Sequence, residues 1–180
     1  GSAALPLLFW LSAAAGSLVL LRRGMNDAFP IVIWALLPAV FWWYLGDPSI
    51  LLILLGSMTL AQVLRATDSW IWVLLTSVVL GVLFALVLWA TSAELIAALA
   101  DAVRQVLQQF AAESKVPAEQ IADVQESLNA TVTGLLASSL QVMSVLCLVL
   151  ARFWQAALYN PGGFGQEFRA VRLPATVALP

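Results

Sequence analysis

The chain has 180 residues, of which 62% are apolar and only 10% are Asp, Glu, Lys or Arg. It has no histidine, a single cysteine (Cys147) and a net charge of −2, which exclude an intrachain disulfide and a cysteine metal cluster and give no sign of nucleic-acid binding. Soluble domains carry roughly 25% charged residues, so this composition excludes both a water-soluble globule and a disordered chain and predicts an integral membrane protein.

Five apolar stretches are long enough, or nearly so, for helices that cross a membrane, each of which takes roughly 20 residues. They cover residues 3–21, 28–45, 49–64, 70–90 and 131–151. The chain turns apolar again after Pro174, which we interpret as the start of a sixth span. It begins with Gly1 and not with Met, so we expect it to start inside a longer protein, with at least one more span upstream if the native N-terminus is cytoplasmic. The predicted fold is all-α: a single domain over residues 1–180 that forms a polytopic transmembrane helix bundle.

The predicted spans contain no ionisable residue in their interiors, which argues against an ion-coupled or proton-coupled transporter within this segment. Neutral polar and aromatic side chains are left as candidate ligand contacts. The candidate ligand-binding residues are Trp10, Trp34, Gln62, Ser138 and Gln141. A structural role also fits them, packing for the tryptophans and an interhelical hydrogen bond for Gln141. Pro38 is expected to kink the second span.

Residues 91–130, between the fourth and fifth spans, are predicted to form a helical hairpin outside the membrane. Thr91-x-x-Glu94 fits a capping box at a helix start, and apolar residues then recur every three or four positions. Pro117 suits the first turn of a second helix, whose apolar positions run on into the fifth span and predict one long helix. The apolar stripes of the hairpin fit three roles: mutual packing, lying on the bilayer, or capping a cavity mouth.

Arginines are divided unequally between the two sides of the predicted bundle. If the spans alternate in direction, one side holds Arg22, Arg23, Arg65, Arg152, Arg169 and Arg172. The other side holds the hairpin, whose six acidic and two basic residues give a net charge of −4. By the positive-inside rule the arginine side is cytoplasmic and residues 91–130 are extracytoplasmic. Arg65 precedes Asp68 by three residues, which predicts a local ion pair.

Two features are candidate docking surfaces for a partner protein. Small residues at four-residue spacing in the first span, Ser12 and Gly16, allow another helix to approach closely. After the fifth span, residues 152–174 form a predicted cytoplasmic loop rich in arginine and aromatic residues, with a turn at Asn-Pro-Gly-Gly. The candidate residues in this loop are Asn160, Gly162, Gly163, Phe164, Phe168, Arg169 and Arg172.

The loop sequence Asn-Pro-Gly-Gly-Phe, followed by Glu-Phe-Arg and by Arg-Leu-Pro, resembles the YybS-like family of uncharacterised bacterial inner-membrane proteins. That family is distantly similar to the S components of energy-coupling-factor transporters. S components hold a vitamin or a metal near the outer face and dock on a transmembrane coupling subunit through small-residue helix faces. The resemblance therefore implies a bacterial inner-membrane location and a coupling subunit as partner, with no catalytic residue, metal or cofactor.

Two functions fit these observations. We expect a non-catalytic subunit that binds or transports a small solute, with its pocket under the hairpin, and the lipid bilayer and a coupling subunit as partners. The alternative is a membrane scaffold or assembly factor that acts through protein contacts at the hairpin and at the arginine-rich loop. An enzyme is not expected, because histidine is absent and the acidic residues are scattered. The sequence does not identify the ligand.

Overall fold

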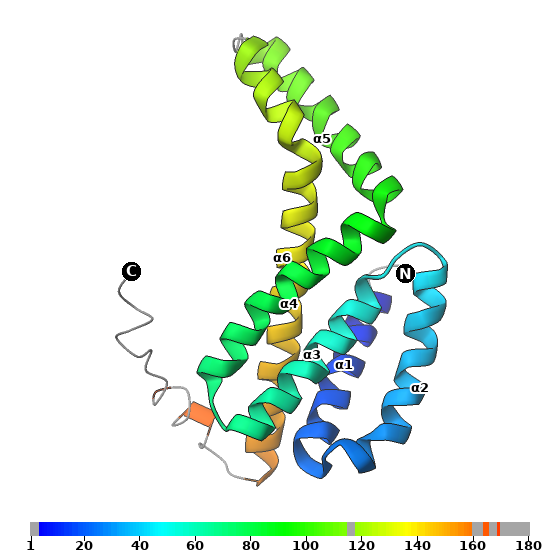
Figure 1. Cartoon of the computed structure of the whole chain (residues 1–180), viewed down its shortest axis with the longest axis vertical. Helices are drawn as coiled ribbons and strands as arrows, with labels where there is room; N and C mark the ends of the chain where they lie inside the picture. The colour runs from blue at the N-terminus through cyan, green and yellow to red at the C-terminus, as the bar shows by residue number, and fades with distance from the viewer. Residues whose placement is uncertain (1–3, 115–117, 160–163, 166–168, 170–180) are drawn as a thin grey trace.

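The computed structural model of the chain is a bundle of helices with an arm at one end (Figure 1). It describes the backbone of residues 4–114, 118–159, 164–165 and 169, and the side chains of residues 9–24, 29–109, 127–158, 164, 165 and 169. The helices are α1 (Ala4–Arg23), α2 (Met25–Tyr44), α3 (Ser49–Thr67), α4 (Trp70–Thr91), α5 (Ala93–Ser114) and α6 (Ala118–Tyr159). The prediction of an all-α helical bundle is confirmed.

Three helices in the described part of the chain are long and apolar enough to cross a membrane: α3, α4 and the Ser127–Leu158 portion of α6. A shorter apolar stretch, Phe29–Tyr44, makes up most of α2. These helices support a membrane protein, while five spans and the start of a sixth stay a prediction. α2 continues through Pro30 and Pro38 as one helix. A proline inside a helix removes one N–H donor and bends a helix without having to end it, so the kink at Pro38 stays a prediction.

Successive helices of the bundle run in opposite directions, so the last turns of α1, α3 and α6 lie at the same end (Figure 1). Arg22 and Arg23 end α1, Arg65 is in the last turn of α3, and Arg152 lies two turns before the end of α6. We call this the arginine end. These four arginines share one end, as predicted from the alternation of spans; the side of the membrane that this end faces stays a prediction.

α5 projects from the opposite end of the bundle and packs against the first part of α6 (Figure 1). Ile96 and Ala100 of α5 are buried in the same apolar cluster as Leu128 and Val132 of α6. We call α5 together with residues 118–132 the α5–α6 arm. From this arm α6 continues into the bundle as one helix of 42 residues, which confirms the predicted long helix.

The start of α5 differs from the predicted capping box. Thr91 belongs to α4, and its hydroxyl donates to the carbonyl oxygen of Val87 at 2.8 Å instead of capping the next helix. Ser92 is the one residue between α4 and α5, and its carbonyl accepts the N–H of Ile96 at 3.0 Å. The capping box is therefore wrong, because the apolar run of α4 carries the helix through Thr91.

The interior of the bundle is built by α1, α3, α4 and α6, and small residues set how closely these helices approach. A Cβ atom added to Gly56 of α3 would lie 2.7 Å from the Phe84 ring of α4 and 2.7 Å from the Ser144 hydroxyl of α6. Leu60 of α3 and Leu148 of α6 are completely buried beside this contact region. The interior is therefore filled by side chains where α3, α4 and α6 meet.

Candidate functional site

One of the predicted ligand-binding residues makes a polar contact between two helices. The Gln141 side-chain amide of α6 donates to the Ser77 hydroxyl of α4 at 3.4 Å, which is a long hydrogen bond. The same side chain lies against Gly81, where an added Cβ would come within 2.9 Å of the Gln141 Cδ atom. Gly81 thus leaves the space in which Gln141 reaches α4. The geometry matches the interhelical hydrogen bond weighed for Gln141 as a structural role.

The other predicted ligand-binding residues are spread over four helices. Trp34 of α2 is 74% exposed, and Ser138 of α6 is exposed with its hydroxyl donating to the carbonyl oxygen of Gly134. Trp10 of α1 is half-buried, and its carbonyl oxygen lies 3.7 Å from the Cys147 sulfur. The five candidates therefore do not line one common cavity in the described part of the chain.

Gln62 of α3 differs from the others because its side-chain oxygen is buried without a partner. In the described part of the chain, two buried side-chain oxygens make no hydrogen bond, Gln62 Oε1 and Ser17 Oγ of α1. Leaving a buried polar group unpaired costs about 1–3 kcal/mol. These two atoms are therefore places where a water, a ligand or a partner's donor would be stabilising.

The predicted docking residues of α1 point in two directions. Ser12 is exposed, whereas Gly16 is buried against α3, where an added Cβ would lie 2.6 Å from the Met58 methyl group. Ala13 and Ser17, the second small-residue pair of α1, are also buried. Most of the small residues of α1 are thus used for packing within this chain, and Ser12 is the member of the predicted pair that faces outward.

The predicted docking loop is described in part. Phe164 is half-buried and packs edge-to-face on Phe153 of α6, with ring centroids 6.0 Å apart. Arg169 is exposed. The predicted docking residues that lie outside the described residues are Asn160, Gly162, Gly163, Phe168 and Arg172.

Arg65 joins two helices at the arginine end. Its guanidinium group donates to the carbonyl oxygens of Leu20 at 2.9 Å and Leu21 at 3.2 Å, so the predicted local pairing with Asp68 is replaced by a contact with α1. The last carbonyls of a helix carry its negative dipole end, which a cation stabilises. The Leu20 oxygen also accepts the N–H of Gly24 at 3.0 Å, so Arg65 is its second donor. Gly24 follows with φ +86°, and an added Cβ there would meet the same guanidinium group at 3.0 Å.

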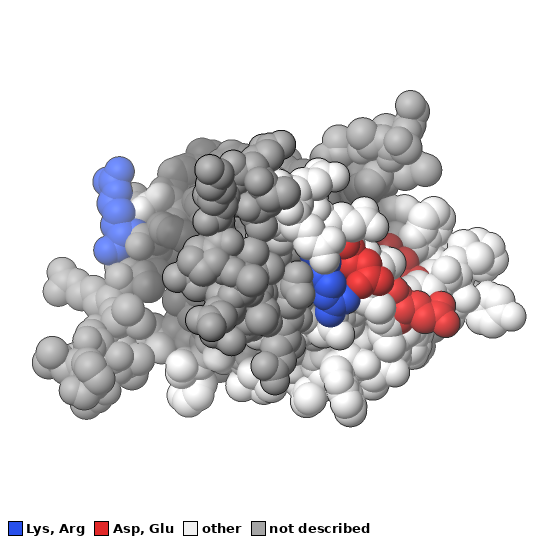
Figure 2. All heavy atoms as spheres, turned by 90° about the horizontal axis from the view of Figure 1, so that it is seen from above, with Lys and Arg blue, Asp and Glu red and all other residues white. Residues whose placement is uncertain are grey.

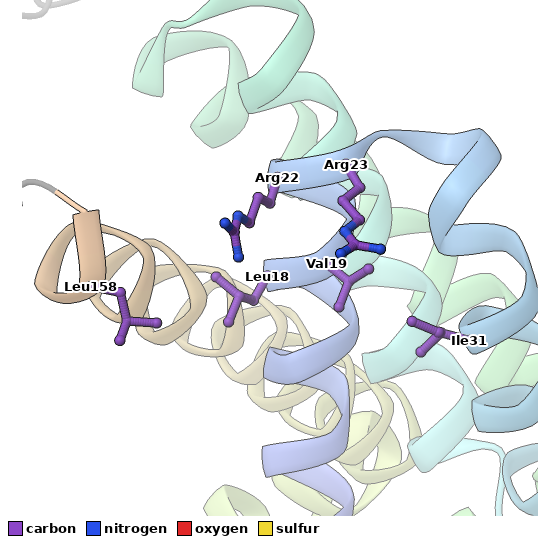
Figure 3. Close-up of a pocket in the computed structure, with 6 residues that line it drawn as sticks. All are labelled: Leu18, Val19, Arg22, Arg23, Ile31 and Leu158. Atoms are coloured by element: carbon purple, nitrogen blue, oxygen red, sulfur yellow. The ribbon is translucent and has the colours of Figure 1, made fainter.

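A groove with a volume of about 340 Å³ opens at the arginine end, beside Arg22 and Arg23 (Figure 3). Its lining residues are Leu18, Val19, Arg22 and Arg23 of α1, Ile31 of α2 and Leu158 of α6. None of the predicted ligand-binding residues lines it, and it lies at the opposite end from the predicted pocket under the hairpin. The sequence signal for it is the four-residue spacing that puts Leu18 beneath Arg22 and Val19 beneath Arg23 on one helix.

The α5–α6 arm carries a second apolar stripe besides the one that packs on α6. Its members are Leu95, Leu99, Ala102 and Val106, which recur at four-, three- and four-residue spacing and are all exposed. On the other side of α5, Arg104 pairs with Asp101 and also donates to the Asn129 side-chain oxygen of α6 at 3.4 Å. Figure 2, which views this end of the molecule, shows acidic side chains gathered on one side next to a basic group.

Comparisons with protein-family models, with curated proteins and with solved structures found no match to this chain. Among the described residues, no group of three or more His, Cys, Asp or Glu lies close enough together to hold a metal ion. Within the residues that the structure describes, the candidate sites are the apolar stripe of α5, the groove at the arginine end, and the two unpaired buried oxygens of Gln62 and Ser17.

Proposed function

We propose that the chain is a non-catalytic subunit of a bacterial inner-membrane assembly and that it binds its partner through the α5–α6 arm. In this proposal the arginine end is cytoplasmic and the arm is extracytoplasmic, in accord with the positive-inside rule. The observation that carries the proposal is the exposed stripe of Leu95, Leu99, Ala102 and Val106. Such a stripe, on a helix that projects away from its own bundle, is typical of a surface that another molecule covers.

The charges of α5 favour a protein partner over the surface of the bilayer. Helices that lie on anionic membranes flank their apolar face with lysine and arginine. Here Glu94 and Asp101 are exposed on the polar side of α5, and the one basic side chain described on this helix, Arg104, is paired with Asp101. The partner surface that fits is an amphipathic helix with apolar residues between basic ones.

The proposal is tested by purifying the assembly from native membranes with a mild detergent and measuring its size. The L99E/V106E variant places two carboxylates in the stripe and is expected to reduce the fraction of the chain in the larger assembly at least tenfold. The matched control is Q105E/Q108E, which adds the same charge to exposed positions on the polar side of α5 and should retain the assembly.

Two results would count against this function. One is a wild-type chain that elutes alone, and the other is an L99E/V106E variant that remains in the assembly. Co-expression of two differently tagged copies separates a self-association of this chain from binding of a different protein, since a second copy would be captured by the first.

A second candidate function is favoured by the unpaired Gln62 oxygen. A solute-binding subunit resembling an energy-coupling-factor S component needs polar groups within the bundle to which a ligand can hydrogen-bond. Gln62 Oε1 is such a group, because it is buried and has no hydrogen-bond partner. Under this alternative the ligand carries a hydrogen-bond donor that reaches α3 from within the membrane.

The Q62L variant distinguishes the two functions. Without a ligand at Gln62, replacing the amide and its unpaired oxygen by an apolar side chain of similar size is expected to raise the free energy of unfolding by about 1–2 kcal/mol. If Gln62 binds a solute, the purified wild-type chain carries a small molecule in native mass spectrometry and Q62L loses both that molecule and its stabilisation. A more stable Q62L with no co-purified molecule rejects the solute-binding function.

A further inference from the structure

The groove at the arginine end combines two chemical characters in a defined order along the helix. Arg22 and Arg23 occupy the last turn of α1, and Leu18 and Val19 lie one turn earlier on the same faces. Ile31 and Leu158 complete the apolar wall from α2 and α6 (Figure 3). A ligand that enters along the helix axis therefore meets two cations at the rim and only apolar side chains beyond them.

The direction of the two arginine side chains follows from helix geometry. The Cα–Cβ bonds of a helix tilt toward its N-terminus, so a residue in the last turn covers the turn before it. Figure 3 shows both side chains lying beside Leu18 and Val19. Their guanidinium groups are thus placed over the mouth of the groove, where an anion would lie directly above the apolar wall.

This arrangement fits an amphiphile with an anionic head. A free anion would use the rim alone, and a neutral apolar solute would gain nothing from two guanidinium groups. Arginine pairs well with phosphate because its planar fork offers parallel N–H donors. Basic pockets between membrane helices are recognised sites for acidic headgroups.

We infer that the groove between α1, α2 and α6 is a binding site for one anionic phospholipid. Its phosphate lies on Arg22 and Arg23, and part of one acyl chain lies against Leu18, Val19, Ile31 and Leu158. The volume of about 340 Å³ holds only a portion of a lipid, so the remaining acyl chain extends into the bilayer. The inference goes beyond the proposed function and does not depend on whether the α5–α6 arm binds a partner.

The test measures lipid binding to the full chain, delipidated in detergent, by native mass spectrometry. Phosphatidylglycerol is expected to bind as a single retained molecule at least tenfold more tightly than phosphatidylcholine with the same acyl chains. The R22Q/R23Q variant should weaken phosphatidylglycerol binding about 25-fold, since each arginine near an anionic surface contributes about fivefold. R22K/R23K keeps the charges and should retain most of the affinity.

Two controls separate the site from general attraction to charge. R152Q/R169Q removes the same charge from positions outside the groove lining and should change binding less than twofold. L158Q disturbs the apolar wall and should weaken both lipids several-fold. Millimolar inorganic phosphate should leave the bound lipid in place, because it lacks the acyl chain.

Several outcomes would overturn the inference. The first is equal affinity for the two lipids. The second is an R22Q/R23Q variant that binds phosphatidylglycerol like wild type, or an R152Q/R169Q variant that weakens binding as much as R22Q/R23Q does. The third is displacement of the lipid by inorganic phosphate, which would indicate a site for free anions. The comparison of the two lipids uses the wild-type chain, so it remains decisive even where a variant unfolds.

Discussion

α3 and α4 are neighbouring helices of similar length that meet different surroundings. α3 buries ten of its 19 residues, among them Gly56, Ser57 and Ala61. α4 is the more apolar of the two and buries only six of its 22 residues. In water the more apolar helix would be the more buried one. The reversed order is expected in a bilayer, where lipid tails accept apolar side chains as readily as a protein interior does.

This difference indicates where the stability of the bundle comes from. The high hydropathy of α4 does not by itself stabilise its packing against neighbouring helices, because valine and leucine side chains are solvated as well by lipid tails as by a protein interior. Close approach at small residues does, as at Gly56 between α3, α4 and α6 and at Gly81 between α4 and α6. Substitutions at small buried residues should therefore have larger effects than truncations on the outer face of α4.

The largest effect is expected for G56L. Even a Cβ atom would lie 2.7 Å from both the Phe84 ring and the Ser144 hydroxyl, so a leucine must push three helices apart. We expect the free energy of unfolding, measured by denaturant titration in micelles, to fall by about 3 kcal/mol or more. The control is G134A, because nothing lies within 4 Å of a Cβ at Gly134; it should be neutral or stabilising by up to about 1 kcal/mol. A G56L variant as stable as wild type would show that the helices do not meet at Gly56.

The next effect concerns Arg65. R65Q removes the charged donor from the carbonyl oxygens of Leu20 and Leu21 and is expected to lower the free energy of unfolding by about 1–2 kcal/mol. This expected loss lies at the lower end of the range for hydrogen bonds from charged donors, because Arg65 is exposed and its charge is screened. R169Q, at an exposed position, should have no measurable effect. Equal effects of the two variants would mean that overall charge, and not the contact with α1, is what matters.

The same truncation on the two faces of α4 gives the most direct check of the comparison. V73A empties a site that is completely buried and should cost about 1 kcal/mol. V82A, at a residue that is 59% exposed, should change the free energy of unfolding by less than about 0.3 kcal/mol, because lipid fills the space. Both are measured by the same denaturant titration. If V82A were the more costly variant, the exposed face of α4 would be covered by protein.

The smallest effect is the coupling between Gln141 and Ser77. A double-mutant cycle with Q141L and S77A should give an interaction energy of about 0.6 kcal/mol, the average for hydrogen bonds between membrane helices. The long distance of 3.4 Å between donor and acceptor argues against a larger value. A coupling above 2 kcal/mol would point to a shorter bond or to a shared third group.

The positions of the helices could be predicted well because their ends carry local signals. The turn between α2 and α3 contains Gly46 with φ +100° and Asp47, whose carboxylate accepts the N–H of Ser49 at 2.9 Å. Such turns depend on neighbouring residues alone, so they are visible in the sequence. Arg65 shows the limit: its pairing with Asp68 was the local expectation, whereas its observed acceptor, Leu20, is 45 residues away.

The candidate site could be predicted much less well. A polar residue in mid-span signals a partner or a ligand, but the pattern does not say which, and Ser77 as the acceptor for Gln141 depends on how α4 and α6 pack. The groove was not predicted because Leu18, Ile31 and Leu158 come from three helices that meet only in the fold. The spacing of Leu18 and Arg22 is common at the ends of membrane helices. It indicates a groove only once the fold places Ile31 of α2 and Leu158 of α6 beside it.

The continuity of α6 has a mechanical consequence. Its 42 residues, at about 1.5 Å each, form a rod about 63 Å long, roughly twice the hydrocarbon thickness. No proline interrupts this rod to serve as a hinge. A tilt of the half that belongs to the α5–α6 arm therefore moves Leu158 in the opposite direction, so a partner bound at one end of α6 changes the position of the other end.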